Sequence, residues 1–400
     1  MSAGRIHATY RVRCAADAIE ARAQALAVEQ SIEMPLAAVR DAWIRDTIVG
    51  RVEAIAPEGA DVDVDAPRRA PEQAWRVDIS LAAATVDGEP GQLMNMLFGN
   101  SSLQPDVELL DAQLPPTLLD ALPGPAFGIP GLRGLVGAPT RPLTCTALKP
   151  QGLPTARLSQ LAELFARAGI DVIKDDHGIA DQACAPFAQR VPAIQAAVAR
   201  ANRETGGATL YAPSLSGGPS KLAGQLRVAR DAGVRCVLAC PMLIGVATFV
   251  DLVRSHGDLV ILAHPALAGA PRIAAPLLLG RLFRIFGADA TIFPNFGGRF
   301  SYDRDTCLAI AGAARDPLGG HRATLPVPAG GMSVARIDEM IETFGCDTML
   351  LIGGNLLEAG DAMPQRASEF VARVHRFALS PGEGAPINAC AVDAARRPQP

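Results

Sequence analysis

The stretch GIDVIKDDHG (Gly169–Gly178) joins an apolar segment directly to a run of ionisable residues. The fold predicted for the whole chain depends on how this stretch is interpreted. Val172 and Ile173 are residue types of a buried β-strand, but the next four positions, Lys174–His177, are all ionisable. Burying a charge without a partner is strongly unfavourable. The sequence therefore predicts a site where these residues have partners, and the most direct reason for such a site is function.

Eight short apolar runs of this kind, the first at 143–149 and the last at 348–354, follow one another at intervals of 23 to 38 residues. Each interval has room for one helix, and LSQLAELFARAG (158–169) and SVARIDEMIETFG (333–345) carry apolar residues at helical spacing. Eight such units predict an α/β fold with a (β/α)8 TIM barrel over residues 142–400. The alternative, an open doubly wound sheet, more often has GxGxxG after its first strand, and that motif is not found there.

The chain before the barrel has a different texture. Alternating residues in RIHATYRVR (5–13) and QAWRVDISL (73–81) predict strands, and the Ala-rich segment at 17–31 predicts a helix. We therefore predict a smaller N-terminal α+β domain of ferredoxin-like type at residues 1–120. The Pro/Gly-rich segment 121–141 is predicted to be a linker.

Composition excludes several classes of protein. The 400 residues carry a net charge of −4, which gives no basic field for nucleic acid. No apolar run reaches the roughly 18 residues that a membrane span needs, and the first residues lack the apolar core of a signal peptide. We therefore expect a cytoplasmic protein that binds neither nucleic acid nor membrane.

In a TIM barrel the active site lies at the carboxyl ends of the strands. Alternation along a strand sends Lys174 and Asp176 to one side and Asp175 to the other. Lys174 and Asp176 are then either a structural ion pair or, if the lysine is carbamylated, ligands of a hard divalent cation. His177 is a third ligand, an acid–base group or a solvated loop residue.

Other strand ends carry further candidates. Lys149 is a proton-moving lysine of lowered pKa, a phosphate-pairing lysine or a structural one. His264 is either functional or a neutral core histidine. Arg299 follows the sixth strand, where it is either a lid residue over an anion or a solvated arginine. The pairs Gly330–Gly331 and Gly353–Gly354 match a phosphate cradle, although tight turns also need glycine.

With these residues in order, the chain resembles the large subunit of RuBisCO, and more closely the non-carboxylating RuBisCO-like proteins. The resemblance rests on LKPQGL (148–153), GIDVIKDDHG, AGG (329–331) and IGG (352–354), which appear in the family's order. It covers nearly the whole chain, because AVEQSIEMP and LMNMLFGN are similar to the two active-site segments of the family's N-terminal domain.

The resemblance implies a homodimer in which the N-terminal domain of one subunit completes the barrel mouth of the other. It also implies Mg²⁺ bound by a carbamate on Lys174 and by Asp176, with His177 standing where the family has an acidic ligand. By the same resemblance, Glu29 and Asn95 are the site residues of the N-terminal domain, and Lys149 transfers a proton. Arg299 stands at the place of the loop-six cation. Phosphate is bound by Gly330, Gly331, Gly353 and Gly354.

Departures from the carboxylases narrow the expected substrate. Pro265 stands where the family keeps an arginine for the far phosphate of a bisphosphate, and Ile292 replaces a histidine. One phosphate site is therefore intact and the other is damaged. The expected substrate carries one phosphate, and CO₂ fixation on ribulose bisphosphate is not expected.

What remains is the equipment to stabilise an enolate or enediolate of a monophosphorylated keto-sugar or 3-oxo sugar acid. Some RuBisCO-like proteins decarboxylate or hydrolytically cleave substrates such as 3-oxo-isoapionate 4-phosphate. By analogy, we predict first a lyase, decarboxylase or C–C hydrolase of that type. The second prediction is a methylthio-sugar phosphate enolase or isomerase of methionine salvage, and the third is a non-catalytic sugar-phosphate binding protein.

Overall fold

The computed structural model describes residues 4–58, 73–298, 300 and 302–378. The chain divides into two compact units, one of Met1–Leu122 with Ala268–Leu278 and one of Pro123–Leu267 with Leu279–Pro400. The short segment that joins the first unit from far along the chain is held there by a parallel bridge between Leu109 and Ile273. This excursion leaves no local pattern in the sequence, because its partner lies more than 150 residues away.

The first unit is a four-stranded antiparallel sheet with helices. Its elements are β1 (Arg5–Cys14), α1 (Ile19–Glu29), β2 (Arg51–Pro57), β3 (Gln73–Ala82), α2 (Pro90–Phe98), β4 (Val107–Gln113) and α3 (Pro116–Ala121). The strand order β2-β3-β1-β4 is that of the ferredoxin-like fold. Alternate residues of β1, such as Ile6 and Tyr10, are fully buried, as the period-two pattern predicts.

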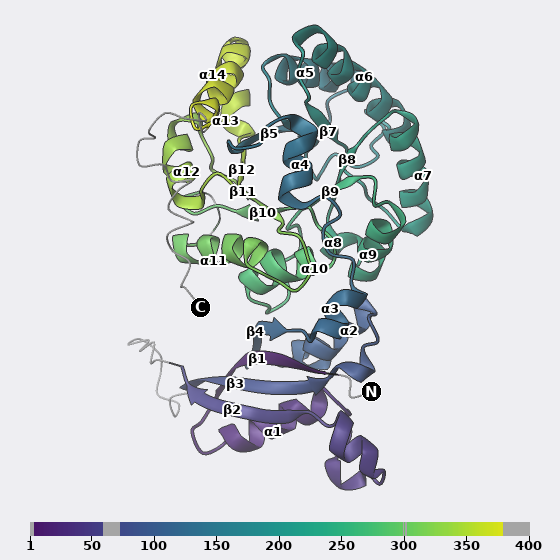
Figure 1. Cartoon of the computed structure of the whole chain (residues 1–400), viewed down its shortest axis with the longest axis vertical. Helices are drawn as coiled ribbons and strands as arrows, with labels where there is room; N and C mark the ends of the chain where they lie inside the picture. The colour runs from purple at the N-terminus through teal and green to yellow at the C-terminus, as the bar shows by residue number, and fades with distance from the viewer. Residues whose placement is uncertain (1–3, 59–72, 299, 301, 379–400) are drawn as a thin grey trace. The chain divides into compact units, whose positions relative to one another are not determined.

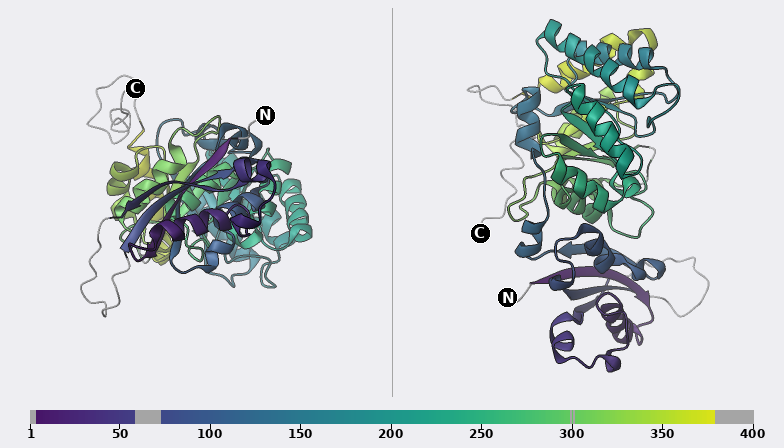
Figure 2. Two further views of the ribbon diagram at one scale, coloured as in Figure 1. Left: turned by 90° about the horizontal axis from the view of Figure 1, so that it is seen from below. Right: turned by 90° about the vertical axis from the view of Figure 1, so that its right-hand side faces the viewer.

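The second unit is a parallel (β/α)8 barrel (Figures 1 and 2). Its strands are β5 (Leu143–Leu148), β6 (Val172–Asp175), β7 (Leu210–Ala212), β8 (Cys236–Ala239), β9 (Val260–Ala263), β10 (Ala290–Pro294), β11 (Leu325–Ala329) and β12 (Met349–Leu351). They form two four-stranded runs, β8 to β11 and β12-β5-β6-β7. The bridge between Ser214 and Leu238 joins β7 to β8, and Thr348 Oγ1 donates to Pro326 O at 3.1 Å where β11 meets β12. The predicted barrel with its smaller N-terminal α+β domain is confirmed.

Helices surround these strands (Figure 2). They are α5 (Thr155–Arg167), α6 (Phe187–Thr205), α7 (Pro219–Asp231), α8 (Pro241–Ile244), α9 (Val246–Ser255), α10 (Phe283–Ile285), α11 (Arg304–Arg315), α12 (Ile337–Phe344), α13 (Gly354–Leu357) and α14 (Met363–His375). Among the residues described, none of the helices combines the length and the apolar character needed to cross a bilayer.

Helix α4 (Gly128–Val136) occupies the segment predicted to be a linker. Its buried residues Ile129, Leu132 and Val136 belong to the same hydrophobic cluster as barrel residues from β5 to β12, such as Leu143 and Val260. Figure 1 shows α4 lying across the strands. The Pro/Gly content suggested a flexible connection, but the apolar spacing of this helix gives it a stable place against the barrel core.

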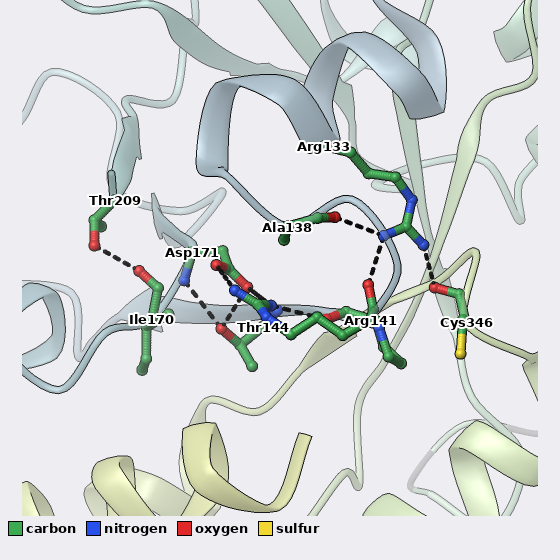
Figure 3. Close-up of polar contacts among 9 residues, drawn as sticks. Arg133, Ala138, Arg141, Thr144, Ile170, Asp171, Thr209 and Cys346 are labelled. Atoms are coloured by element: carbon green, nitrogen blue, oxygen red, sulfur yellow. Dashed lines mark hydrogen bonds and ion pairs between the residues drawn. The ribbon is translucent and has the colours of Figure 1, made fainter. Parts of the chain in front are cut away.

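A buried ion pair and an arginine that donates to backbone carbonyls lie at the amino-terminal ends of the strands (Figure 3). Asp171, just before β6, accepts two bonds of 2.7 Å from the Arg141 guanidinium and one of 2.8 Å from the Thr144 amide. Arg133 of α4 donates to the carbonyls of Ala138 and Cys346. A bidentate arginine–carboxylate pair at this depth fixes the register of β5 and β6.

We predict that Asp171→Ala lowers the free energy of unfolding by about 3–5 kcal/mol, because it leaves the Arg141 charge buried without a partner. Chemical denaturation measures the loss, and kcat per folded molecule should stay within twofold. The matched control is Asp258→Ala, which breaks an exposed pair with Arg230 and should cost less than about 1 kcal/mol. Equal losses in the two variants would contradict the structural role assigned to Asp171.

Candidate active site

The carboxyl end of β6 sends its charged residues to two sides, as the alternation predicts. Asp175 is fully buried and accepts hydrogen bonds from Arg190 Nη2 (3.0 Å), the Tyr211 hydroxyl (2.9 Å) and the Ser214 amide (3.0 Å). Burial raises the pKa of Asp175, and the Arg190 charge acts against that rise. Asp175 is therefore a structural anchor for the strand end.

Asp176 faces the other side, where Lys149 at the end of β5 forms an ion pair with its Oδ2. Its Oδ1 accepts from the Gly178 amide at 3.1 Å and lies 3.3 Å from His177 Nδ1. Burial acts to raise the pKa of Asp176, but the Lys149 contact, the Gly178 amide and the Lys174 charge outweigh it and lower the pKa to about 2. Asp176 is therefore a carboxylate at neutral pH.

Lys174 lies beside this pair and is only 3% exposed. Its Nζ donates to the Asp175 carbonyl at 3.0 Å. Burial lowers the pKa of Lys174, and the nearby Lys149 ammonium adds to that effect. A lysine whose neutral form is favoured in this way is suited to amine chemistry, including reaction with CO₂.

Two imidazoles complete the cluster. The rings of His177 and His264 stack with centroids 4.1 Å apart and planes inclined by 18°. The Ala266 amide donates to His264 Nδ1 at 3.1 Å, so the ring hydrogen of neutral His264 lies on Nε2. Burial, followed by the Lys174 charge, lowers the pKa of His264 to about 2. His264 is therefore uncharged at neutral pH, and its Nε2–H is the hydrogen-bond donor of the ring.

The two glycine pairs lie at the ends of β11 and β12. Gly330 and Gly331 have φ of +78° and +70°, and a Cβ on Gly331 would lie 2.4 Å from Gly298 Cα in the loop after β10. A Cβ on Gly353 would lie 3.9 Å from Lys149 Cε, so this pair is next to the charged cluster. The glycines therefore allow close approach of the backbone, which a phosphate cradle requires.

The N-terminal candidates fall in the first unit. Glu29, the last residue of α1, accepts from Asn100 Nδ2 at 3.1 Å through its Oε1. Asn95 instead donates to Gln92 Oε1 at 3.4 Å, within α2. The structure thus places Asn100, which sequence reasoning missed, next to Glu29. Its position in LFGN, directly after a helix-ending glycine, was the available signal.

Two further residues to consider at the strand ends are Arg299 and Cys240. Arg299, predicted to be the loop-six cation, lies outside the described residues. Cys240, at the end of β8, is a buried thiol that the sequence analysis did not select. Burial, in spite of the Lys174 charge, raises its pKa to about 11. Cys240 is therefore a neutral neighbour of the cluster at neutral pH.

The residues implied as magnesium ligands lie together but form an incomplete donor set. Among the described residues, no group of three or more His, Cys, Asp or Glu side chains is placed to hold a metal ion. Mg²⁺ prefers oxygen ligands, and Asp176 is the carboxylate at this position, already paired with Lys149. The set fits a hard cation when Lys174 carries a carbamate and Asp176 exchanges Lys149 for the cation.

Comparison with known proteins agrees with this arrangement. The family model for the ribulose bisphosphate carboxylase large chain, catalytic domain, matches residues 128–272. A 5-methylthioribulose-1-phosphate isomerase of Rhodospirillum rubrum is 54% identical over 371 residues, 92% of this chain and 96% of the relative. A 2,3-diketo-5-methylthiopentyl-1-phosphate enolase of Geobacillus kaustophilus is 32% identical over 291 residues, 70% of each chain.

The crystal structure of a RuBisCO-like protein from Rhodopseudomonas palustris has a TM-score of 0.85 and 50% identity, and it covers 94% of this chain and 99% of that chain. The chain therefore belongs to the RuBisCO large-chain family. Two of its near-full-length relatives, this crystal structure and a ribulose bisphosphate carboxylase-like protein of Rhodopseudomonas palustris that is 53% identical over 92% of this chain, are RuBisCO-like proteins, which confirms the resemblance inferred from the sequence.

We predict that Gly331→Ala destabilises the protein on the order of 3 kcal/mol, because the new methyl group overlaps Gly298 and the left-handed φ is strained. Thermal denaturation measures this loss. The matched control is Gly354→Ala, where a Cβ has open space around it. That control should keep its melting temperature and, if the pair binds phosphate, show a higher KM. Unchanged stability of Gly331→Ala would contradict the packing described.

Proposed function

We propose that this protein is an isomerase of a ketose monophosphate of the 5-methylthioribulose 1-phosphate type. The isomerase of Rhodospirillum rubrum, similar over nearly the whole chain, supports the second predicted function rather than the first. The observation that carries the proposal is the position of Lys149, which pairs with Asp176 and lies beside Gly353 of the phosphate cradle. A proton carrier next to a phosphate anchor is what enolisation of a sugar phosphate needs.

The reaction moves a proton from one carbon to the neighbouring carbonyl carbon, and the hydroxyl proton of the first carbon moves to the former carbonyl oxygen. The carbonyl and hydroxyl groups thus exchange places, and no atom is gained or lost. With the phosphate held at the glycine pairs, the amine form of Lys149 takes the proton from the carbon beside the carbonyl. The resulting ammonium then returns the proton to the adjacent carbon. The Nε2–H of neutral His264 donates a hydrogen bond to the oxygen that becomes negative.

Lysine is required here, because arginine does not lose its proton in proteins. The chain has only three lysines, Lys149, Lys174 and Lys221, among 37 basic residues, and the first two are both at the site. A surface salt bridge pairs the third with Asp181. This distribution supports a chemical role for Lys149 and Lys174, since elsewhere the chain uses arginine.

Mg²⁺ is part of the proposal. Lys174 as a carbamate, Asp176 and His177 would hold it, and it would supply positive charge to the developing oxyanion. We also propose a homodimer, as the resemblance implies, in which Glu29 of one subunit completes the site of the other. The resemblance gives it Asn95 as a companion, but we assign that place to Asn100, which donates to Glu29. The alternatives of C–C cleavage and of simple ligand binding are arms of the tests that follow.

Lys149→Met should lower kcat on 5-methylthioribulose 1-phosphate by about 10²–10⁴-fold, because it removes the proton carrier. NMR in D₂O measures both turnover and deuterium exchange at carbon, and Lys221→Met is the matched control that should retain activity. A wild type that releases CO₂ from 3-oxo sugar-acid phosphates but leaves the methylthio substrate unchanged would favour C–C cleavage. Ligand-induced thermal stabilisation without turnover of either substrate would favour a binding protein.

Incubation with ¹³CO₂ and Mg²⁺ should give a carbamate signal by NMR and a mass increase of one CO₂ on the peptide that contains Lys174. Titration calorimetry should show Mg²⁺ binding that depends on CO₂. Lys174→Arg, which cannot form a carbamate, should show neither signal. Magnesium binding of equal strength in wild type and Lys174→Arg would contradict the proposed ligand set without touching the isomerase assignment.

A further inference from the structure

The barrel order places the ends of β8 and β9 across the mouth from the glycine pairs and from Lys149. The strands follow one another from β5 to β12 and back to β5, so β8 is four strands from β12 and β9 is four strands from β5. The phosphate cradle lies at β11 and β12, and Lys149 lies at β5. A substrate fixed by both therefore directs its far end toward β8 and β9.

Two exposed leucines follow those strands. Leu243 of α8 is 57% exposed, and Leu267, three residues after His264, is 56% exposed. The segments that follow β8 and β9 leave the barrel side by side, because the His264 amide donates to the Ala239 carbonyl at 2.9 Å. Exposed large apolar side chains at the mouth of a binding site are candidates for contact with an apolar part of a ligand.

The backbone at Leu267 gives an independent indication. Its φ is +67°, a left-handed conformation that is unusual for a leucine. Such strain costs on the order of 1–3 kcal/mol and is found most often at functional sites. A glycine or asparagine would adopt this turn more easily, so the apolar side chain itself gives a reason for the leucine.

Charge at this part of the mouth also restricts the ligand. The sequence has no lysine, arginine, aspartate or glutamate in segments 236–250 and 259–271. A second phosphate or a carboxylate at the far end of the substrate would find no cation from these two segments. A neutral, apolar end is the group that they fit.

We propose that Leu243 and Leu267 form an apolar subsite that selects ketose monophosphates with an alkylthio group at the end opposite the phosphate. This inference rests on the proposed function and deepens it, because the leucines would distinguish a thioether from the hydroxyl of an ordinary pentulose phosphate. Both are specificity residues that contact substrate and take no part in proton transfer.

The test compares kcat/KM on 5-methylthioribulose 1-phosphate and on ribulose 1-phosphate. Leu267→Asn suits the left-handed turn, and Leu243→Gln keeps the length of the side chain. Each variant should lose about tenfold on the methylthio substrate and change less than twofold on ribulose 1-phosphate. Leu103→Asn, at an 83% exposed leucine of the first unit, is the control and should leave the ratio of the two substrates unchanged.

Equal losses on both substrates, or no loss on either, would overturn the subsite. So would a change of sedimentation coefficient in Leu243→Gln or Leu267→Asn, because it would place the leucines between copies of the chain.

If wild type turns over neither substrate, the isomerase proposal fails, and calorimetry then tests the subsite separately. The probes are the unreactive 2-alcohols made by reducing the two ketoses: wild type should bind the methylthio compound about tenfold more tightly, and equal affinities would reject the subsite.

Discussion

The geometry of the rest of the site depends on the hydrogen bonds that hold the buried carboxylate of Asp175. Three donors from α6, from β7 and from the loop after β7 hold it, with distances of 2.9 to 3.0 Å. Because neighbouring residues of a strand point to opposite sides, fixing Asp175 outward fixes Lys174 and Asp176 toward the mouth. The chemistry therefore takes its geometry from a residue that does not take part in it.

Three aspartates at the two ends of β6 show how the choice of partner separates stability from chemistry. Asp171 and Asp175 pair with Arg141 and Arg190, and arginine side chains do not lose their proton in proteins. Asp176 pairs with Lys149, which is able to exchange a proton. Permanent cations thus hold the strand, and the cation beside Asp176 is the one that is able to exchange a proton, as the proposed isomerisation requires.

Much of this arrangement could be predicted from the sequence, because it follows from local periodicity. The eight strand ends, the sidedness of Lys174 and Asp175, and the glycine pairs all depend on spacing within one segment. The partners Arg190 and Tyr211 could not be predicted, since contacts across elements depend on how the helices pack. The same reason explains why α4 was taken for a linker, and why Asn100 was missed beside Glu29, 71 residues earlier.

The histidine at position 177 affects both the binding of a metal ion and the protonation state of His264. In the arrangement described, its ring lies against His264 and its Nδ1 is 3.3 Å from Asp176. Two stacked imidazoles this close oppose a charge on both, so a proton on His177 favours the neutral state of His264. An acidic residue at 177 would strengthen metal binding but would also favour a charge on His264. The imidazole at 177 therefore gives up a strong metal ligand and favours the neutral state of His264, the state that the proposed proton transfer requires.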